Sequence, residues 1–260
     1  MIPANAITAW GVTRPWPNRA AIEQDLLLAR TIVAIYDDPF LADELVFRGG
    51  TCLHQLHLPA PLRYSEDLDF VRRSHTGIGE IFNHLRAVAA DLGLEVHGTY
   101  TGVNPKMRMR ARAEDNEELW LRIKVEINTH ETSPALPLIA MPFSVASTWF
   151  AGAADVFTFQ TAELVATKIR ALYQRSKGRD IFDLWLALDH LKVPAACIRE
   201  AFSPYRPDGW TRALATANLT AKLANDGFRH DLDPLVAQWP PDYNIDSAAE
   251  LIRTELIERL

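Results

Sequence analysis

Two aspartates one residue apart, Asp67 and Asp69, alternate with the apolar residues Leu68 and Phe70 in the stretch RYSEDLDF. Alternate side chains of a β-strand point to the same face, so the two carboxylates would emerge together while the apolar pair faces the other way. Two neighbouring anions repel unless they are solvated, share a proton or bind a cation, and a divalent metal ion gives such a pair chemistry to do. Acidic pairs at strand ends are also common as solvated loop residues, so the pair alone leaves both interpretations open.

A third carboxylate, Glu126, lies in the stretch LWLRIKVEIN, where apolar and polar residues alternate as in a half-buried strand. This stretch and KMRMRAR, residues 106–112, are predicted to form a hairpin, because a short polar segment separates them. Glu126 would then lie on a strand beside the one that carries Asp67 and Asp69. The alternative is an ordinary strand with a solvated polar face.

A glycine turn precedes the acidic pair. Gly49 and Gly50 follow the predicted strand ELVFR and begin the predicted helix TCLHQLHL, with Thr51 adding a hydroxyl. Glycines let the backbone approach a ligand closely, and the N–H groups at a helix start attract phosphate. Taken alone, such a turn is usually only a tight connection, and it is not a P-loop because no Gly-Lys-Ser/Thr follows.

The second half of the chain carries another group of charges. In TAELVATKIRALYQ, helical spacing places Lys168 near the middle of the apolar face, where a lysine needs an anionic partner unless its chain extends to the rim. In KGRDIFDLW, Asp180 and Asp183 share one helix face beside Arg179. An acidic first turn that stabilises its own helix is the alternative explanation for these aspartates.

The elements that must position these residues divide the chain in two. Residues 1–154 predict a mixed α/β core, with a helix that begins after Asn18 and ends at Asp38-Pro39, and another that ends at Gly93. Residues 155–260 predict helices with polar connections. We therefore expect an α+β fold, with a mixed sheet and flanking helices followed by a helical C-terminal domain that completes the active site.

Composition excludes several classes of protein. The 260 residues are 48% hydrophobic and carry a formal net charge of −6, so any nucleic-acid contact must be a local patch. The first residues lack the layout of a signal peptide, and no apolar run reaches the ~18 residues of a membrane span, so we expect a cytoplasmic protein without a membrane partner. Cys52, His54 and His57 lack a fourth zinc ligand and lie in a predicted half-buried helix, which argues against zinc.

The order of the glycine turn, the Asp-x-Asp strand and the later glutamate resembles the nucleotidyltransferase superfamily related to DNA polymerase β. The stretches QDLLL, FRGGTCL, SEDLDF, ELVATKIRAL and RDIFDLW together resemble the AbiEii/AbiGii toxin family, which includes the MenT toxins, over roughly residues 20 to 190. The resemblance implies the toxin of a toxin–antitoxin pair, with a cognate antitoxin protein as partner. Its activity would be transfer of a nucleoside monophosphate from an NTP to the 3′ end of tRNA, which blocks translation.

The resemblance also implies roles for single residues. Asp67 and Asp69 would be ligands of Mg²⁺ or Mn²⁺, and Glu126 is added as a third metal ligand from the superfamily pattern. Lys168 would contact nucleotide phosphate, and Asp180 would complete the catalytic site as a base or orienting group, while Asp183 matches the motif without an assigned role. The triphosphate pocket would be lined by Gly49, Gly50, Thr51 and Ser65.

The sequence also suggests a surface that binds the acceptor and a way in which the activity is inhibited. A basic surface for RNA is available in Arg108, Arg110 and Arg112 on one strand face, together with Arg179, although arginines on a solvated face are common. Phosphorylation of Ser65 or Thr51 would add negative charge beside the substrate's phosphates, and we expect it to inhibit. Two other functions stay open: NTP-dependent modification of a protein acceptor, and a nucleotide-binding regulator without turnover.

Overall fold

Two compact units make up the computed structural model, which describes residues 2–75, 77–116 and 118–260. The first unit comprises Met1–Pro134 and Leu138–Phe159, and the second comprises Ala135–Pro137 and Gln160–Leu260. The sequence predicts a division between residues 154 and 155, which falls inside a strand of the first unit.

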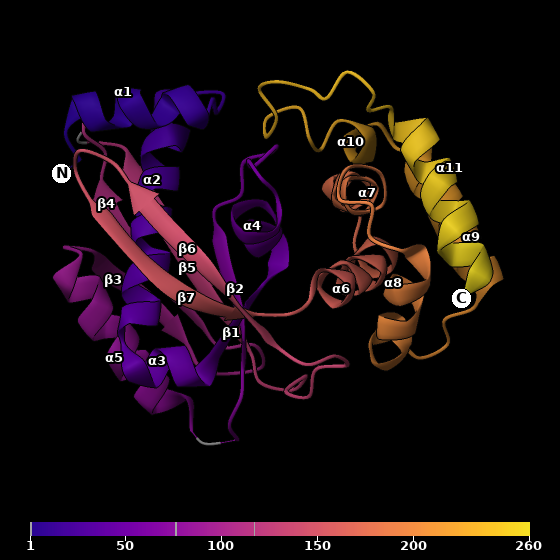
Figure 1. Cartoon of the computed structure of the whole chain (residues 1–260), viewed down its shortest axis with the longest axis horizontal. Helices are drawn as coiled ribbons and strands as arrows, with labels where there is room; N and C mark the ends of the chain where they lie inside the picture. The colour runs from indigo at the N-terminus through magenta and orange to yellow at the C-terminus, as the bar shows by residue number, and fades with distance from the viewer. Residues whose placement is uncertain (1, 76, 117) are drawn as a thin grey trace. The chain divides into compact units, whose positions relative to one another are not determined.

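The first unit contains a seven-stranded mixed sheet and the helices that cover it (Figure 1). Its helices are α1 (Ala4–Thr13), α2 (Arg19–Asp37), α3 (Pro39–Glu44), α4 (Gly49–Cys52), which continues as a π-helical turn (Leu53–His57), and α5 (Ile78–Asp91). Its strands are β1 (Leu45–Arg48), β2 (Asp67–Arg72), β3 (Glu95–Tyr100), β4 (Lys106–Arg112), β5 (Trp120–Asn128), β6 (Ile139–Ala146) and β7 (Ala151–Thr158).

The strand order β3-β4-β5-β2-β1-β7-β6 places β2 near the middle of the sheet. It runs antiparallel to β1 and parallel to β5, while β4 and β5 form the antiparallel hairpin that the sequence predicts. Apolar side chains of β4 and β5, such as Met109 and Ile123, are buried on one face of the sheet, and helix α2 packs against β5, β6 and β7. The polar side chains of the same strands lie on the opposite face.

Local sequence explains where the helices of this unit begin and end. Asn18 accepts a hydrogen bond from the Ala21 N–H and caps α2, as predicted, and Asp38 ends α2 and caps α3. Gly93 has a φ of +68°, the left-handed conformation that commonly ends a helix, and it follows α5. The hairpin of β6 and β7 is a correction, because the sequence did not indicate these two strands.

The second unit is helical, as the sequence predicts. Its elements are α6 (Thr161–Gln174), α7 (Arg179–Trp185) with a following π-helical turn (Leu186–His190), α8 (Ala195–Phe202), α9 (Arg212–Leu223), α10 (Asp226–Arg229), α11 (Ile245–Glu255) and two short 3₁₀ turns (Ser203–Tyr205 and Ile257–Arg259). Helix α6 packs against α7, α8 and α9. The buried Glu163 on α6 accepts hydrogen bonds from the N–H groups of Ala135 and Leu136 and from the Tyr205 hydroxyl, which ties residues 135–137 to this unit.

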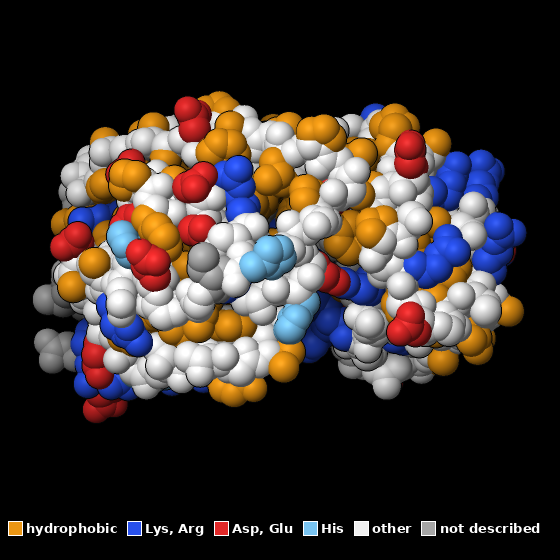
Figure 2. All heavy atoms as spheres, turned by 90° about the horizontal axis from the view of Figure 1, so that it is seen from below, with side chains coloured by type: hydrophobic (Ala, Val, Ile, Leu, Met, Phe, Trp, Pro, Cys, Tyr) orange, Lys and Arg blue, Asp and Glu red, His pale blue; other side chains and the backbone are white. Residues whose placement is uncertain are grey.

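The surface is mixed in character. On the face drawn in Figure 2, hydrophobic, acidic and basic side chains of the described residues are interspersed, and no large apolar patch is visible.

Candidate active site

Three carboxylates lie together on the polar face of the sheet in the first unit. Asp67 and Asp69 share this face of β2 because Leu68 between them is buried on the other. The parallel pairing of β2 with β5 sets Asp69 directly beside Glu126. Since neighbouring strands lie about 5 Å apart, these three side chains can reach a common point above the sheet.

Basic side chains surround the carboxylates. The Lys124 ammonium lies 2.8 Å from Asp67 Oδ2 and 3.5 Å from Glu126 Oε2, and the Lys106 ammonium lies 3.2 Å from Glu126. Burial lowers the pKa of Lys124, but its hydrogen bond to Asp67 and the neighbouring negative charges outweigh this, so its pKa is raised. Sequence analysis missed these two lysines as site residues, although their alternation with apolar residues on predicted strands could have shown them.

The carboxylates themselves are crowded. Burial raises the pKa of Asp69, and the charge of Asp67 raises it further, whereas Arg48 opposes the shift. A divalent cation bound to the three carboxylates would remove this cost, and carboxylate oxygens are the ligands that Mg²⁺ prefers. The donor set of Asp67, Asp69 and Glu126 therefore fits the divalent metal that the resemblance implies.

The glycine turn packs directly against these groups. Gly49 has a φ of +87°, and a Cβ at this position would overlap the carboxylate of Asp69. A Cβ on Gly50 would overlap the guanidinium of Arg63, a nearly buried residue that sequence analysis did not select. Glycine is required at Gly49 because both the backbone conformation and the approach of Asp69 exclude a side chain.

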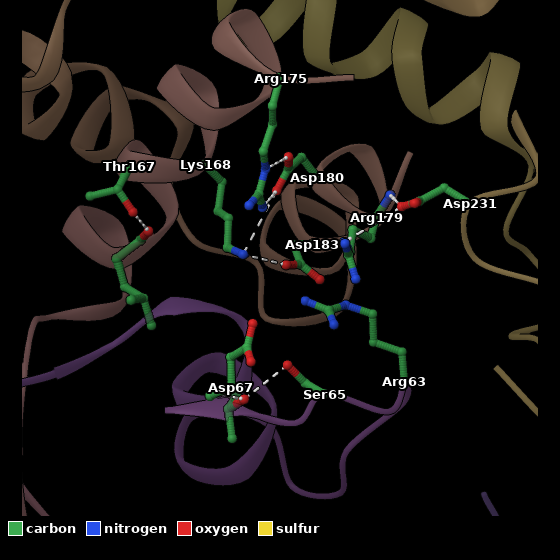
Figure 3. Close-up of polar contacts among 12 residues, drawn as sticks. Arg63, Ser65, Asp67, Thr167, Lys168, Arg175, Arg179, Asp180, Asp183 and Asp231 are labelled. Carbon is green, nitrogen blue, oxygen red and sulfur yellow. Dashed lines mark hydrogen bonds and ion pairs between the residues drawn. The ribbon is translucent and has the colours of Figure 1, made fainter. Parts of the chain in front are cut away.

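Thr51 and Ser65 connect the glycine turn to β2. The Thr51 hydroxyl lies 2.6 Å from the carbonyl oxygen of Asp67 and 2.8 Å from the Ser65 hydroxyl. A carbonyl only accepts, so Thr51 donates its single proton there and the Ser65 hydroxyl donates to Thr51. Thr51 is 1% exposed, so it is a structural residue of the site and is not accessible to a kinase. Ser65 is half-buried beside Asp67 (Figure 3).

Cys52, His54 and His57 are buried below this turn. Cys52 lies 3.0 Å from the Thr158 hydroxyl, and His54 Nδ1 accepts a hydrogen bond from the Leu62 N–H. Burial lowers the pKa of His57 to about 4, so its ring is neutral near pH 7. These contacts give the three side chains roles in the packing of the first unit.

The second unit contains a buried cluster of charges. The Lys168 ammonium lies 2.8 Å from Asp183 and 3.8 Å from Asp180, and both aspartates are fully buried (Figure 3). Arg175 donates two hydrogen bonds of 2.7 Å to Asp180. The anionic partners that Lys168 was predicted to need are thus the two aspartates of α7. Arg179, by contrast, lies 3.5 Å from Asp231 and does not belong to this cluster.

The arginines predicted to bind RNA differ in how they are held. Arg110 forms an ion pair of 2.7 Å with Glu95 and its guanidinium lies 4.0 Å from the centre of the Trp120 ring. Arg112 also lies over Trp120, at 3.6 Å, whereas Arg108 extends from β4 into solvent. The three arginines lie on one strand face, as the sequence predicts, and the strand pairing shows that this face also carries Asp67.

Comparison with known proteins agrees with this geometry. Residues 30–250 match the family model of the AbiEii nucleotidyl transferase toxin of type IV toxin–antitoxin systems. The chain belongs to the AbiEii toxin family. It is therefore a nucleotidyltransferase toxin of a type IV toxin–antitoxin system, and membership implies an NTP substrate and an antitoxin partner.

One solved structure similar to this AbiEii protein supports its fold. The MenT4 nucleotidyltransferase toxin from Mycobacterium tuberculosis matches with a TM-score of 0.67 at 18% identity, over 98% of this chain and 90% of that one. An antigenic nucleotidyltransferase-like protein from Paracoccidioides brasiliensis matches 76% of this chain and 88% of its own, with a TM-score of 0.45 at 21% identity, a likeness too slight to support an inference. No curated protein matches the sequence.

The AbiEii family assignment agrees with the sequence-based expectation of an enzyme with an α+β fold. Among the described residues, none of the helices is both long and apolar enough to cross a lipid bilayer.

Proposed function

We propose that this AbiEii toxin transfers a nucleoside monophosphate from an NTP to the 3′ hydroxyl of tRNA in a reaction that requires Mg²⁺ or Mn²⁺. The new bond joins the 3′ oxygen to the α-phosphorus, pyrophosphate leaves, and the modified tRNA no longer supports translation. The observation that carries the proposal is the placement of Asp67, Asp69 and Glu126 on one sheet face, directly beside the glycine turn. A carboxylate cluster that holds divalent ions next to a phosphate-binding turn is the arrangement that nucleotidyl transfer requires.

The three carboxylates would hold the metal. When bound there, a divalent ion neutralises charge on the phosphates and lowers the pKa of an attacking hydroxyl. Other residues of the chain position the glycine turn and β2. Gly49 keeps the turn close to Asp69, Thr51 fixes the start of β2 through its bond to the Asp67 carbonyl, and Arg63 places positive charge at Gly50.

Lys168 and Asp180 are proposed to contribute to activity through the charge cluster of the second unit, with the phosphate contact and the base or orienting role that the resemblance assigns to them. Both side chains form ion pairs within that unit. Their effect on activity must therefore be measured separately from their effect on stability.

The experiment is incubation of the purified protein with total tRNA, Mg²⁺ and each α-labelled NTP in turn. Label should enter tRNA with one or two of the NTPs. Asp67→Asn should abolish the signal, because it removes one metal-ligand charge while keeping the shape of the side chain. Asp91→Asn, the same substitution at an exposed residue that ends α5, is the matched control and should retain full activity.

Other outcomes point to the alternatives. Label in protein in place of tRNA would replace the RNA acceptor with a protein acceptor. Saturable NTP binding without any transfer, with all carboxylates intact, would indicate a nucleotide-binding regulator. Arrest of growth by a soluble Asp67→Asn protein would contradict the proposed mechanism altogether.

A further inference from the structure

A pocket of about 460 Å³ opens on the polar face of the sheet next to Asp67. It lies over β3, β4 and β5, and its walls include His97, Arg108, Arg122 and Lys124, so we refer to it as the basic pocket. Its volume lies in the range of small-ligand sites and is sufficient for one unpaired nucleotide. Of the three proposed metal ligands only Asp67 lines it, and Glu66 is the other acidic residue in its wall.

Two of the basic side chains in the pocket are already neutralised by protein carboxylates. Lys124 is paired with Asp67, and Arg110 is paired with Glu95. Arg108 and Arg122 differ, because neither guanidinium forms an ion pair or hydrogen bond with any residue in the described part of the chain.

The position of Arg122 is nevertheless well defined. The amide side chain of Gln24 on α2 accepts a hydrogen bond from the Arg122 N–H and donates one to its carbonyl oxygen, at 3.0 and 2.5 Å. These bonds hold the strand in place where β2 no longer pairs with it. Two exposed arginines on adjacent, paired strands are suited to bind one anionic group together, and phosphate is one of the two groups, with carboxylate, whose geometry matches a guanidinium.

Strand order then distinguishes between the two phosphate-bearing substrates. In the order β4-β5-β2-β1, the basic pocket lies on the β5 side of Asp67, and the glycine turn after β1 lies on the other side. In an in-line displacement the attacking oxygen and the leaving group lie on opposite sides of the phosphorus. If the triphosphate lies at the glycine turn, the acceptor must approach from the basic pocket.

The strand register gives the approximate backbone distances of Arg108 and Arg122 from the residues beside the carboxylates. Asp67 pairs with Lys124 and Lys124 pairs with Arg108, so Arg108 is two strands from Asp67, which is roughly 10 Å. Arg122 is two residues from Lys124 along β5, or roughly 7 Å. These distances suit a phosphate adjacent in the chain to the reacting hydroxyl.

We propose that Arg108 and Arg122 bind the terminal phosphodiester of the single-stranded 3′ end of the RNA acceptor in the basic pocket, and thereby present its 3′ hydroxyl to the carboxylates. This inference rests on the proposed function, whose acceptor it locates. It assigns a role to Arg122, which sequence analysis did not select, and separates Arg108 from Arg110 and Arg112, which are held by Glu95 and Trp120.

The first test measures binding and needs no turnover. A fluorescent single-stranded RNA oligonucleotide is titrated with full-length protein and followed by anisotropy, beside the same oligonucleotide with an uncharged methylphosphonate as its last linkage. Wild-type protein should bind the modified RNA at least tenfold more weakly. The Arg108→Gln/Arg122→Gln variant should bind both RNAs equally, and the slope of its log affinity against log salt concentration should be smaller by roughly 0.7, the value for one phosphate contact on single-stranded RNA. Arg86→Gln removes one positive charge at an exposed arginine on α5 outside the pocket; it is the surface control and should behave as wild type.

The second test is steady-state transfer of labelled nucleotide. The double variant should show a KM for RNA at least tenfold higher and an unchanged KM for the NTP. Either of two results would overturn the inference. One is an unchanged KM for RNA in the double variant. The other is that the methylphosphonate weakens RNA binding by the same factor in the wild-type protein and in the double variant. A wild-type protein that discriminates the terminal linkage but labels no RNA would instead show that the proposed function is wrong and the binding site real.

Discussion

The buried charge cluster of the second unit allows a quantitative prediction about Lys168. Lys168→Met keeps the length of the side chain and removes its charge, which leaves Asp183 buried without the ammonium that lies 2.8 Å away. The side chain of Asp183 is 0% exposed and that of Lys168 is 6% exposed, so water cannot replace the lost partner. Breaking a buried pair by removing one member costs about 3–5 kcal/mol. This is a large share of the ~5–15 kcal/mol by which a typical protein is stable.

The assay is urea unfolding followed by circular dichroism, for Lys168→Met, Asp183→Asn and the double variant. The double variant should be less destabilised than the sum of the single variants, because it removes both charges together. Lys192→Met is the matched control. Lys192 pairs with Asp189 at 3.2 Å on the surface of the same unit, and its loss should cost less than about 1 kcal/mol.

Activity under fully folded conditions separates the two roles of Lys168. If Lys168 only stabilises the fold, Lys168→Met has the wild-type KM for the NTP. If Lys168 binds a phosphate of the NTP, the KM of this variant is raised. A loss of stability below about 1 kcal/mol in this variant would refute the argument that the aspartates of α7 are its partners, since a buried pair cannot be broken so cheaply.

Three further changes have defined outcomes. Gly49→Ala should abolish nucleotide transfer and lower the free energy of unfolding by roughly 1–3 kcal/mol. Gly93→Ala, with a similar positive φ but open space around it, should keep its activity. Thermal unfolding and the tRNA assay compare the two variants, and equal activity would contradict the close approach of Asp69. Glu163→Gln should lower the free energy of unfolding by about 1–3 kcal/mol. An amide nitrogen cannot accept the hydrogen bonds that the carboxylate receives from the N–H groups of residues 135 and 136 and from the Tyr205 hydroxyl. An unchanged urea midpoint would show that these bonds do not stabilise the second unit. Removal of divalent ions with EDTA should stop transfer until Mg²⁺ or Mn²⁺ is added back, and calorimetric Mn²⁺ binding that persists in Asp69→Asn would exclude that residue as a ligand.

Local patterns identified most elements of the first unit and much of the candidate site. Alternation along β2 determined that Asp67 and Asp69 share a face, because the side-chain period of a strand is two. Asn18 and Gly93 were recognisable as helix ends from residue type. The β6–β7 hairpin escaped detection because it contains Pro142 and is rich in alanine and glycine, which have weak strand propensity.

The sequence by itself determined the kinds of residue at the site and their order, from which the family resemblance followed. Only the tertiary structure decided the register that sets Asp69 beside Glu126, because pairing between distant strands depends on packing across the whole sheet. It also decided which charges are neutralised inside the protein, as Lys168 is by Asp183, and which are free to bind a substrate, as in Arg108 and Arg122. The partner of a buried charged side chain is set by the packing of separate helices and strands, as for Lys168 on α6 and Asp183 on α7, so residue type alone does not distinguish a structural ion pair from a ligand-binding one.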